Sequence, residues 1–332
     1  MQKNKLTSEQ KRSIKIRTIT AFVLIALILP CIILGNWFFV GISALILVGV
    51  GYETVHITQL KGATRKIAFW VMIVLLLVTC YYVFFRKFLN GYNAGEHFTF
   101  DNFVALNFTE MAISEMILML SAAVLFIISF VREDFEIRYV FYFLSMIVIL
   151  SLGVQSLLYL RFAPFVSFEA AGVDVKTDGF KHFHSLLLIL YMILGVCVND
   201  IGAFFTGLKF GKHKMAPRVS PKKTWEGAIG GVIISFAISF SFAMVIDAVG
   251  YPIFPVLNIE HWYYLLVISL LIPVIGDVGD FVFSAVKRSF NVKDYSTLLP
   301  GHGGIIDRLD SIIFAGGLVS GLVIFIQFMG NL

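Results

Sequence analysis

The segment 277–288 contains five polar or charged residues whose spacing would place them on one face of a helix. Asp277, Asp280, Ser284 and the pair Lys287 and Arg288 follow one another at intervals of three or four residues, so in a helix they line one stripe. Two carboxylates, a hydroxyl and two cations within a largely apolar run predict a polar seam that points into the protein. The alternative is a set of acid–base pairs, such as Asp280 with Lys287, that only hold helices together.

Three further aspartates lie beside neighbouring apolar runs. Asp200 is near the end of one run, and Asp307 and Asp310 open another with an i, i+3 spacing. Placing an ionisable side chain within a membrane helix costs about 2.5–3.5 kcal/mol on insertion scales, so such residues usually mark a site. Carboxylates bind Mg²⁺ in ones or twos, with waters and substrate phosphates completing the octahedron. We therefore predict a site for Mg²⁺ and a nucleotide, with all five aspartates as candidate metal ligands.

A glycine-rich turn, Pro-Gly-His-Gly-Gly at 300–304, precedes the last of these acids. A glycine turn that leads into a helix offers free backbone N–H groups and a positive dipole end, which together suit phosphate. Gly303 and Gly304 are thus candidate phosphate-binding residues. His302 contacts phosphate if it is protonated, although a lone histidine is more often an ordinary loop residue.

The segment 206–224 is basic and contains no acidic residue. Ser220 is expected to cap a helix whose first position is Pro221. That helix start aims N–H groups and two lysines at an anion, so we predict substrate binding by Ser220, Lys222, Lys223 and Thr224. The alternative is a basic loop that touches anionic lipid headgroups.

The elements that position these residues are membrane helices. The chain has 332 residues, of which 58% are hydrophobic and 14% charged, whereas soluble domains are about half apolar and a quarter charged. A bilayer core requires about 20 mostly apolar residues per helix. Nine candidate spans follow, and we predict an all-α polytopic integral membrane protein. The spans are 18–35, 36–52, 67–85, 113–131, 139–160, 184–205, 225–248, 262–284 and 311–329.

The distribution of positive charge predicts the orientation, because cationic loops stay in the cytoplasm. With a cytoplasmic N-terminus, the inner segments hold every one of the 26 Lys and Arg residues except Arg86, Lys87, Arg161, Lys176 and Lys181. The net charge of +5 is therefore explained by topology, and no nucleic-acid partner is expected. The same orientation places all five aspartates at the cytoplasmic edge of the membrane.

We expect one continuous membrane domain with two functional parts. Residues 1–183 form a transmembrane scaffold with a basic cytoplasmic tail, and residues 184–332 form the catalytic region. The outer loops at about 86–112 and 161–183 are mildly acidic and are expected to be solvated segments without chemistry.

The run from Ser284 to Asp310 resembles the signature of the phosphatidate cytidylyltransferases, also called CDP-diacylglycerol synthases. The stretches 199–212, 220–231 and 276–280 are similar to the same family. The matching run reads Ser284-x-Val286-Lys287-Arg288-x₄-Lys293-Asp294-x-Ser296-x₂-Leu299-Pro300-x-His302-Gly303-Gly304-Ile305-x-Asp307-Arg308-Leu309-Asp310.

This resemblance implies the reaction CTP + phosphatidate → CDP-diacylglycerol + pyrophosphate, at the cytoplasmic face of the cell's inner membrane. It implies a requirement for Mg²⁺, a monovalent cation such as K⁺, and a homodimer. By matching position, Asp277 and Asp307 are the leading metal ligands. Asp280 and Asp310 are expected to be secondary ligands or to orient the first pair. The residues expected to act on phosphates or substrate are Lys287, Arg288, His302, Arg308, Ser284 and Lys293.

Two other functions fit some of these features. A CTP-dependent lipid kinase would transfer the γ-phosphoryl group and release CDP instead of pyrophosphate. A transporter would carry its acids near the bilayer centre in repeat-related halves, whereas here they are predicted at one face and no internal repeat is visible.

Overall fold

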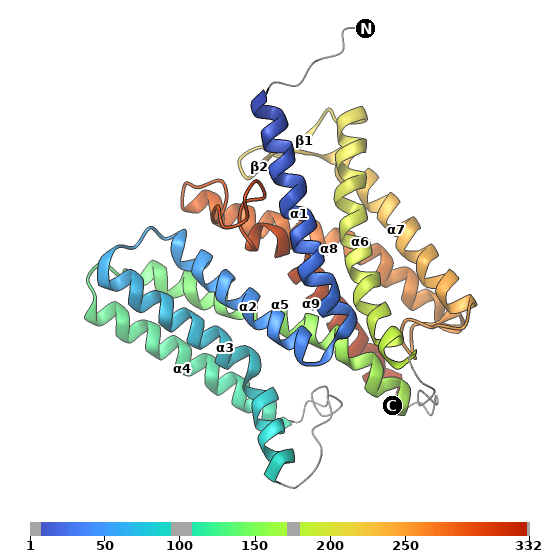
Figure 1. Cartoon of the computed structure of the whole chain (residues 1–332), viewed down its shortest axis with the longest axis horizontal. Helices are drawn as coiled ribbons and strands as arrows, with labels where there is room; N and C mark the ends of the chain where they lie inside the picture. Colours follow the sequence, from blue (N-terminus) through green and yellow to red (C-terminus); the bar gives the residue numbers. More distant parts are fainter. Residues whose placement is uncertain (1–7, 94–107, 171–179, 331–332) are drawn as a thin grey trace.

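Helices make up almost all of this protein in a computed structural model that describes residues 8–93, 108–170 and 180–330 (Figure 1). Nine long helices run through those residues, as predicted. Their bounds are α1 Ser8–Leu34, α2 Asn36–His56, α3 Gly62–Asn93, α4 Phe108–Val131, α5 Ile137–Ala170, α6 Phe180–Phe210, α7 Trp225–Ala248, α8 Trp262–Ser289 and α9 Ile306–Gly330. Eight are long and apolar enough to cross a membrane, and the described apolar part of α4, Glu115–Val131, is shorter. The all-α membrane fold is confirmed, while the cytoplasmic N-terminus stays a prediction.

Most helices extend beyond the predicted spans, and two of these extensions change the predicted outer loops. Helix α3 continues to Asn93 and α5 to Ala170, so the outer loops begin later than expected. Both helices are longer than a bilayer core requires, and hydropathy alone therefore places their ends too early. The rest of those loops, at 94–107 and 171–179, lies outside the described residues.

A glycine separates the first two helices, as the short predicted connection requires. Gly35 has φ +63°, a conformation that glycine adopts readily. The guanidinium of Arg161, from α5, donates from Nε to the carbonyl of Ile32 over 2.8 Å. Since the last carbonyls of a helix have no partner within it, Arg161 stabilises the end of α1. This cation is only 2% exposed.

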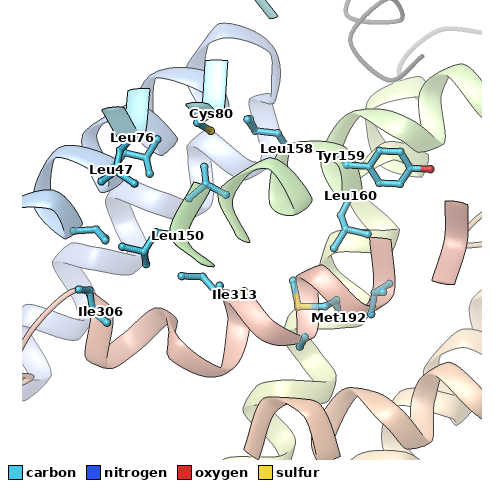
Figure 2. Close-up of a cluster of buried hydrophobic side chains, with 14 of the residues drawn as sticks. Leu47, Leu76, Cys80, Leu150, Leu158, Tyr159, Leu160, Met192, Ile306 and Ile313 are labelled. Carbon is cyan, nitrogen blue, oxygen red and sulfur yellow. The ribbon is translucent and has the colours of Figure 1, made fainter. Parts of the chain in front are cut away.

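The apolar core lies where α2, α3, α5, α6 and α9 meet (Figure 2). Leu47, Leu76 and Leu150 are completely buried there. Glycines bring helices close together: a Cβ on Gly153 of α5 would lie 2.2 Å from the side chain of Ile313 in α9. Small residues at such crossings are typical of membrane helices. By contrast, α1 exposes large apolar side chains such as Phe22, as expected of a helix in contact with lipid.

Helices α6 and α7 pack closely near the end of α6 and the start of α7. A Cβ on Gly202 would lie 3.2 Å from the Cα of Gly231, and one on Gly207 would lie 3.5 Å from the Cα of Gly227. The segment that joins these helices forms an antiparallel hairpin of β1 Lys214–Ala216 and β2 Ser220–Thr224. In Figure 1 the hairpin lies at the same end of the molecule as the first half of α1.

Candidate active site

The predicted polar stripe on α8 exists, and its first two members share one lysine from the hairpin. The Lys223 ammonium lies 2.5 Å from Asp277 Oδ1 and 3.0 Å from Asp280 Oδ2. The Ser284 hydroxyl donates to the other oxygen of Asp280 over 3.1 Å. The side chains of Asp277 and Lys223 are 10% and 21% exposed, so this pair is mostly shielded from solvent. Two carboxylates one helical turn apart thus converge on a single positive charge.

A second, more deeply buried ion pair joins α8 to α9. Lys287 donates to Asp307 Oδ1 over 2.7 Å, and the two side chains are 9% and 6% exposed. The other oxygen of Asp307 accepts hydrogen bonds from the backbone N–H groups of Tyr295 and Gly304, both over 3.0 Å. The acid–base pairs considered as an alternative are therefore present, but Lys287 binds Asp307 and not Asp280.

Asp200 and Asp310 lie close enough to this cluster to interact with it electrostatically. Asp200 interacts with Lys223, Asp277 and Asp280, and Asp310 interacts with Asp280 and Asp200. Asp200 is exposed on α6, whereas Asp310 is buried on α9. The structure thus brings acids from α6, α8 and α9 within electrostatic range of one another, while their place at the cytoplasmic edge of the membrane stays a prediction.

The hairpin corrects the predicted start of α7. Ser220 does not cap a helix at Pro221, because residues 220–224 form β2 and the helix begins at Trp225. Its N-cap is Thr224, whose hydroxyl accepts the N–H of Gly227 over 3.2 Å. Pro221 is tolerated on a strand whose other edge is unpaired, and a local sequence pattern does not reveal the pairing with β1.

A cavity of about 390 Å³ opens between the hairpin, α6 and α8. Its polar lining consists of Lys214, Lys222, Lys223, Asp200 and Asp277, together with the cap residue of α7. Apolar side chains of α6, such as those at positions 204 and 208, form another part of the wall. The cavity therefore presents three cations and two carboxylates beside a surface suited to an apolar group.

The electrostatic environment keeps Lys223 protonated. Burial alone would lower its pKa, but the carboxylates of Asp277 and Asp280 outweigh burial and raise the pKa above its ordinary value. Burial also raises the pKa of the Tyr295 phenol, which therefore stays neutral. Below pH 10 the lysine is a fixed positive charge beside the two acids.

The glycine turn is built as expected, but the N–H groups of His302, Gly303 and Gly304 are not free. Gly301 and Gly303 have φ +76° and +85°, and the N–H groups of His302 and Gly303 donate to the carbonyl of Leu299. The N–H of Gly304 donates to Asp307. The N–H groups of the next two residues, 305 and 306, donate to Glu53 of α2. The expectation that these groups are free for phosphate is therefore wrong. The Nδ1 atom of His302 is buried without a hydrogen-bond partner.

The remaining candidates occupy supporting or peripheral positions. Arg308 donates twice to the carbonyl of His302, over 3.0 and 2.8 Å, and so clamps the turn. Arg288 donates to the carbonyls of Val219 and Val292 and joins the hairpin to the loop after α8. Lys293 is exposed. The structure thus brings the lysines and aspartates together more closely than the arginines.

One carboxylate at this end of the molecule was missed in the sequence. Glu53 of α2 is completely buried, and it accepts the hydroxyl of Ser296 over 2.6 Å. It also accepts the N–H groups of Ile305 and Ile306 over 2.7 and 2.8 Å. An acidic residue one turn from the end of an apolar run was the available signal, since ionisable residues in such runs usually mark a site.

Asp277 and Asp280 are the carboxylates that could contribute ligands to a divalent cation. Their oxygens already converge on the Lys223 ammonium, and hard oxygen ligands of this kind suit Mg²⁺. Among the described residues no group of three or more His, Cys, Asp or Glu side chains has the geometry of a complete metal site. A Mg²⁺ ion here therefore requires substrate oxygens or water as its other ligands, which is usual for this ion.

Comparison with known proteins identifies a family to which this chain is similar. The model of the Cytidylyltransferase family matches residues 15–326. A phosphatidate cytidylyltransferase of Haemophilus influenzae is 39% identical over 156 residues, which cover 46% of this chain and 52% of that protein. One of Bacillus subtilis is 41% identical over 131 residues, covering 40% and 45%. The chain thus spans about half the length of the curated relatives it matches.

Proposed function

We propose that this chain, which belongs to the cytidylyltransferase family, transfers a cytidylyl group from CTP to phosphatidate and releases pyrophosphate. The relatives that it matches carry the name phosphatidate cytidylyltransferase. The observation that carries the proposal for the site is the convergence of carboxylates and lysines where the hairpin, α6, α8 and α9 come together. Such a cluster suits a polyphosphate with its metal ion, and the helices around it suit a lipid substrate.

The chemistry requires charge neutralisation more than a strong base. A phosphate monoester has its second pKa near about 6, so the phosphatidate headgroup is largely dianionic at neutral pH and already nucleophilic. One of its oxygens forms a bond to the α-phosphorus of CTP, the bond from that phosphorus to the bridging oxygen breaks, and pyrophosphate leaves with the electron pair. Catalysis then depends on positioning and on electrostatic stabilisation.

The residues of the cavity and of the charged cluster beside it divide between these tasks. Lys222 and Lys223 line the cavity, where their ammonium groups would hold phosphate oxygens of the two substrates in line. Asp277 and Asp280 would hold Mg²⁺, which when bound supplies positive charge to the triphosphate. Lys287 carries its charge at the inner edge of the same cluster, held there by Asp307. Aspartate acts in this scheme as a ligand and not as the base.

The setting follows from the same chemistry. Phosphatidate presents its phosphate at the headgroup level, so we propose that the lysine-rich hairpin faces the cytoplasm at the inner membrane, as the positive-inside pattern predicts. A homodimer and a monovalent cation such as K⁺ belong to the proposal on the strength of the family resemblance. The scheme needs no nucleic-acid partner.

Purified chain in vesicles that contain phosphatidate tests the proposal. With CTP and Mg²⁺ we expect a cytidine liponucleotide and one pyrophosphate per product, and no turnover after chelation of divalent ions with EDTA. Asp277→Asn should remove activity, whereas Asp247→Asn, on α7 outside the cluster, is the matched control. Release of CDP with a phosphorylated lipid would instead identify a lipid kinase. Absence of any CTP-dependent product would contradict both assignments.

A further inference from the structure

Glu53 differs from the other acids of this region in what it binds. Its carboxyl group contacts no lysine or arginine in the described ion pairs, and it accepts one hydroxyl and two backbone N–H groups from the segment 296–306. That segment lies more than two hundred residues further along the chain. A carboxyl group from the scaffold half therefore enters the loop that leads into α9.

The contact replaces a cap that α9 cannot make for itself. The first N–H groups of a helix have no partner within it and are usually satisfied by a Ser, Thr, Asp or Asn at the N-cap. The residue before α9 is Ile305, whose side chain has no acceptor. Glu53 supplies the acceptor from α2, and its negative charge also interacts favourably with the positive end of the helix dipole.

The same short loop fixes Asp307. Gly304 donates its N–H to Asp307 over 3.0 Å, while a Cβ at this glycine would lie only 2.7 to 2.9 Å from the carboxyl atoms of Glu53. Gly304 is thus held between the two carboxylates. A shift of Glu53 would move the backbone that binds Asp307, and with it the acceptor of Lys287.

We propose that Glu53 is a positioning residue, which sets the loop 295–306 so that Asp307 and Lys287 keep their places in the active site. The predicted effect of Glu53 on catalysis rests on the proposed function, whereas its effect on the loop does not. Through this contact the N-terminal half of the chain takes part in the reaction without touching substrate.

The test compares Glu53→Gln and Glu53→Asp with Thr54→Val in reconstituted full-length chain. Glutamine keeps the shape but turns an NH₂ group toward backbone donors, and aspartate keeps the charge but is one methylene shorter. Thr54 is the matched control, because it is equally buried on the same helix and its hydroxyl donates only to Val50 of its own turn.

Amide hydrogen exchange reports the contact without substrate. In Glu53→Gln we expect exchange in the segment 304–306 to be at least about tenfold faster, since hydrogen bonds to a charged group are worth about a factor of ten or more. We also expect kcat to fall by at least about tenfold, the half-saturating Mg²⁺ concentration to rise, and KM for phosphatidate to change little. Glu53→Asp should restore part of each effect, and Thr54→Val should match the wild type.

Two results would overturn the inference. The first is unchanged exchange in segment 304–306 of Glu53→Gln. The second is faster exchange with wild-type kcat and Mg²⁺ dependence, which would leave Glu53 a purely structural cap. If Glu53→Gln does not fold, Glu53→Asp decides by the same readouts. A wild-type chain with no activity on CTP and phosphatidate contradicts the proposed function instead, and the exchange measurement still tests the contact.

Discussion

The buried pair of Lys287 and Asp307 allows the sharpest prediction, through a double-mutant cycle. Their charged atoms are 2.7 Å apart, with side chains only 9% and 6% exposed. Two unit charges at that separation attract by about 6 kcal/mol at an effective dielectric constant of about 20. Removing one partner of a buried pair costs about 3–5 kcal/mol in practice. We expect Asp307→Asn to lower the free energy of unfolding by about 3–5 kcal/mol.

The two single variants should differ because their partners differ. Both backbone N–H groups that Asp307 accepts share one carboxylate oxygen. An asparagine oxygen in that place keeps them, but its NH₂ group then faces the Lys287 ammonium, which loses its only carboxylate partner among the described ion pairs. Lys287→Met leaves Asp307 with both of these donors and should be less damaging. The double variant removes both charges, so its loss of stability should be smaller than the sum of the two single losses.

Stability and turnover should then separate. Thermal unfolding in detergent should show the double variant recovering part of the midpoint lost in Asp307→Asn. Its kcat should stay at least about 100-fold below the wild type, because electrostatic stabilisation of the transferred phosphate is lost. A wild-type midpoint in Asp307→Asn, additive single effects, or a double variant with wild-type turnover would each refute this interpretation.

Two further predictions concern the hairpin. Lys223→Met should lower the unfolding midpoint through repulsion between Asp277 and Asp280. The pKa of Lys223 is raised in the folded state. Its contribution to stability should therefore be fully present below the ordinary lysine pKa of about 10.4 and lost only as the pH rises through the higher pKa of the folded state. A stability advantage of the wild type over Lys223→Met that disappears near neutral pH would contradict this. Thr224→Ala should cost about 1 kcal/mol by removing the N-cap of α7, and Thr224→Ser should retain most of it. Equal unfolding midpoints for the alanine and serine variants would show that the cap is not needed.

The parts of the fold that were predicted correctly depend on local sequence. Apolar runs of the right length identify membrane helices, because every backbone polar group in lipid must be satisfied within the helix. The stripe from Asp277 to Lys287 was likewise predictable, since helical periodicity alone puts these residues on one face. The helix ends at Asn93 and Ala170 were missed because a helix can continue past the hydrocarbon core into polar sequence.

The features that were missed depend on contacts between distant segments. The ion pair between Lys223 and Asp277 joins residues that are 54 positions apart in the sequence. It forms because residues 214–224 make a hairpin instead of the expected helix start. The glycine turn at 300–304 is present as predicted, but the N–H groups of its last three residues are bound by the carbonyl of Leu299 and by Asp307. The two N–H groups that follow the turn are bound by Glu53 of α2. A pattern of glycines indicates where a backbone is free to turn and does not show what has already bound it.

The balance of charge explains why this site should take its nucleotide together with a cation. Five aspartates gather around two lysines, and Lys223 and Lys287 are each already held by a carboxylate. A free triphosphate entering the cavity would meet Lys214 and Lys222, but at the α8 side it would face carboxylates whose nearest cation, Lys223, is already paired. The low dielectric near a membrane interior strengthens the repulsion from those carboxylates. A divalent ion between Asp277 and Asp280 would reverse the balance and release Lys223, which the cavity geometry leaves beside the space where phosphates would lie. In the proposed scheme the carboxylates would therefore serve two purposes. They hold Lys223 and Lys287 in place before substrate arrives, and those on α8 would supply metal ligands that free Lys223 for phosphate.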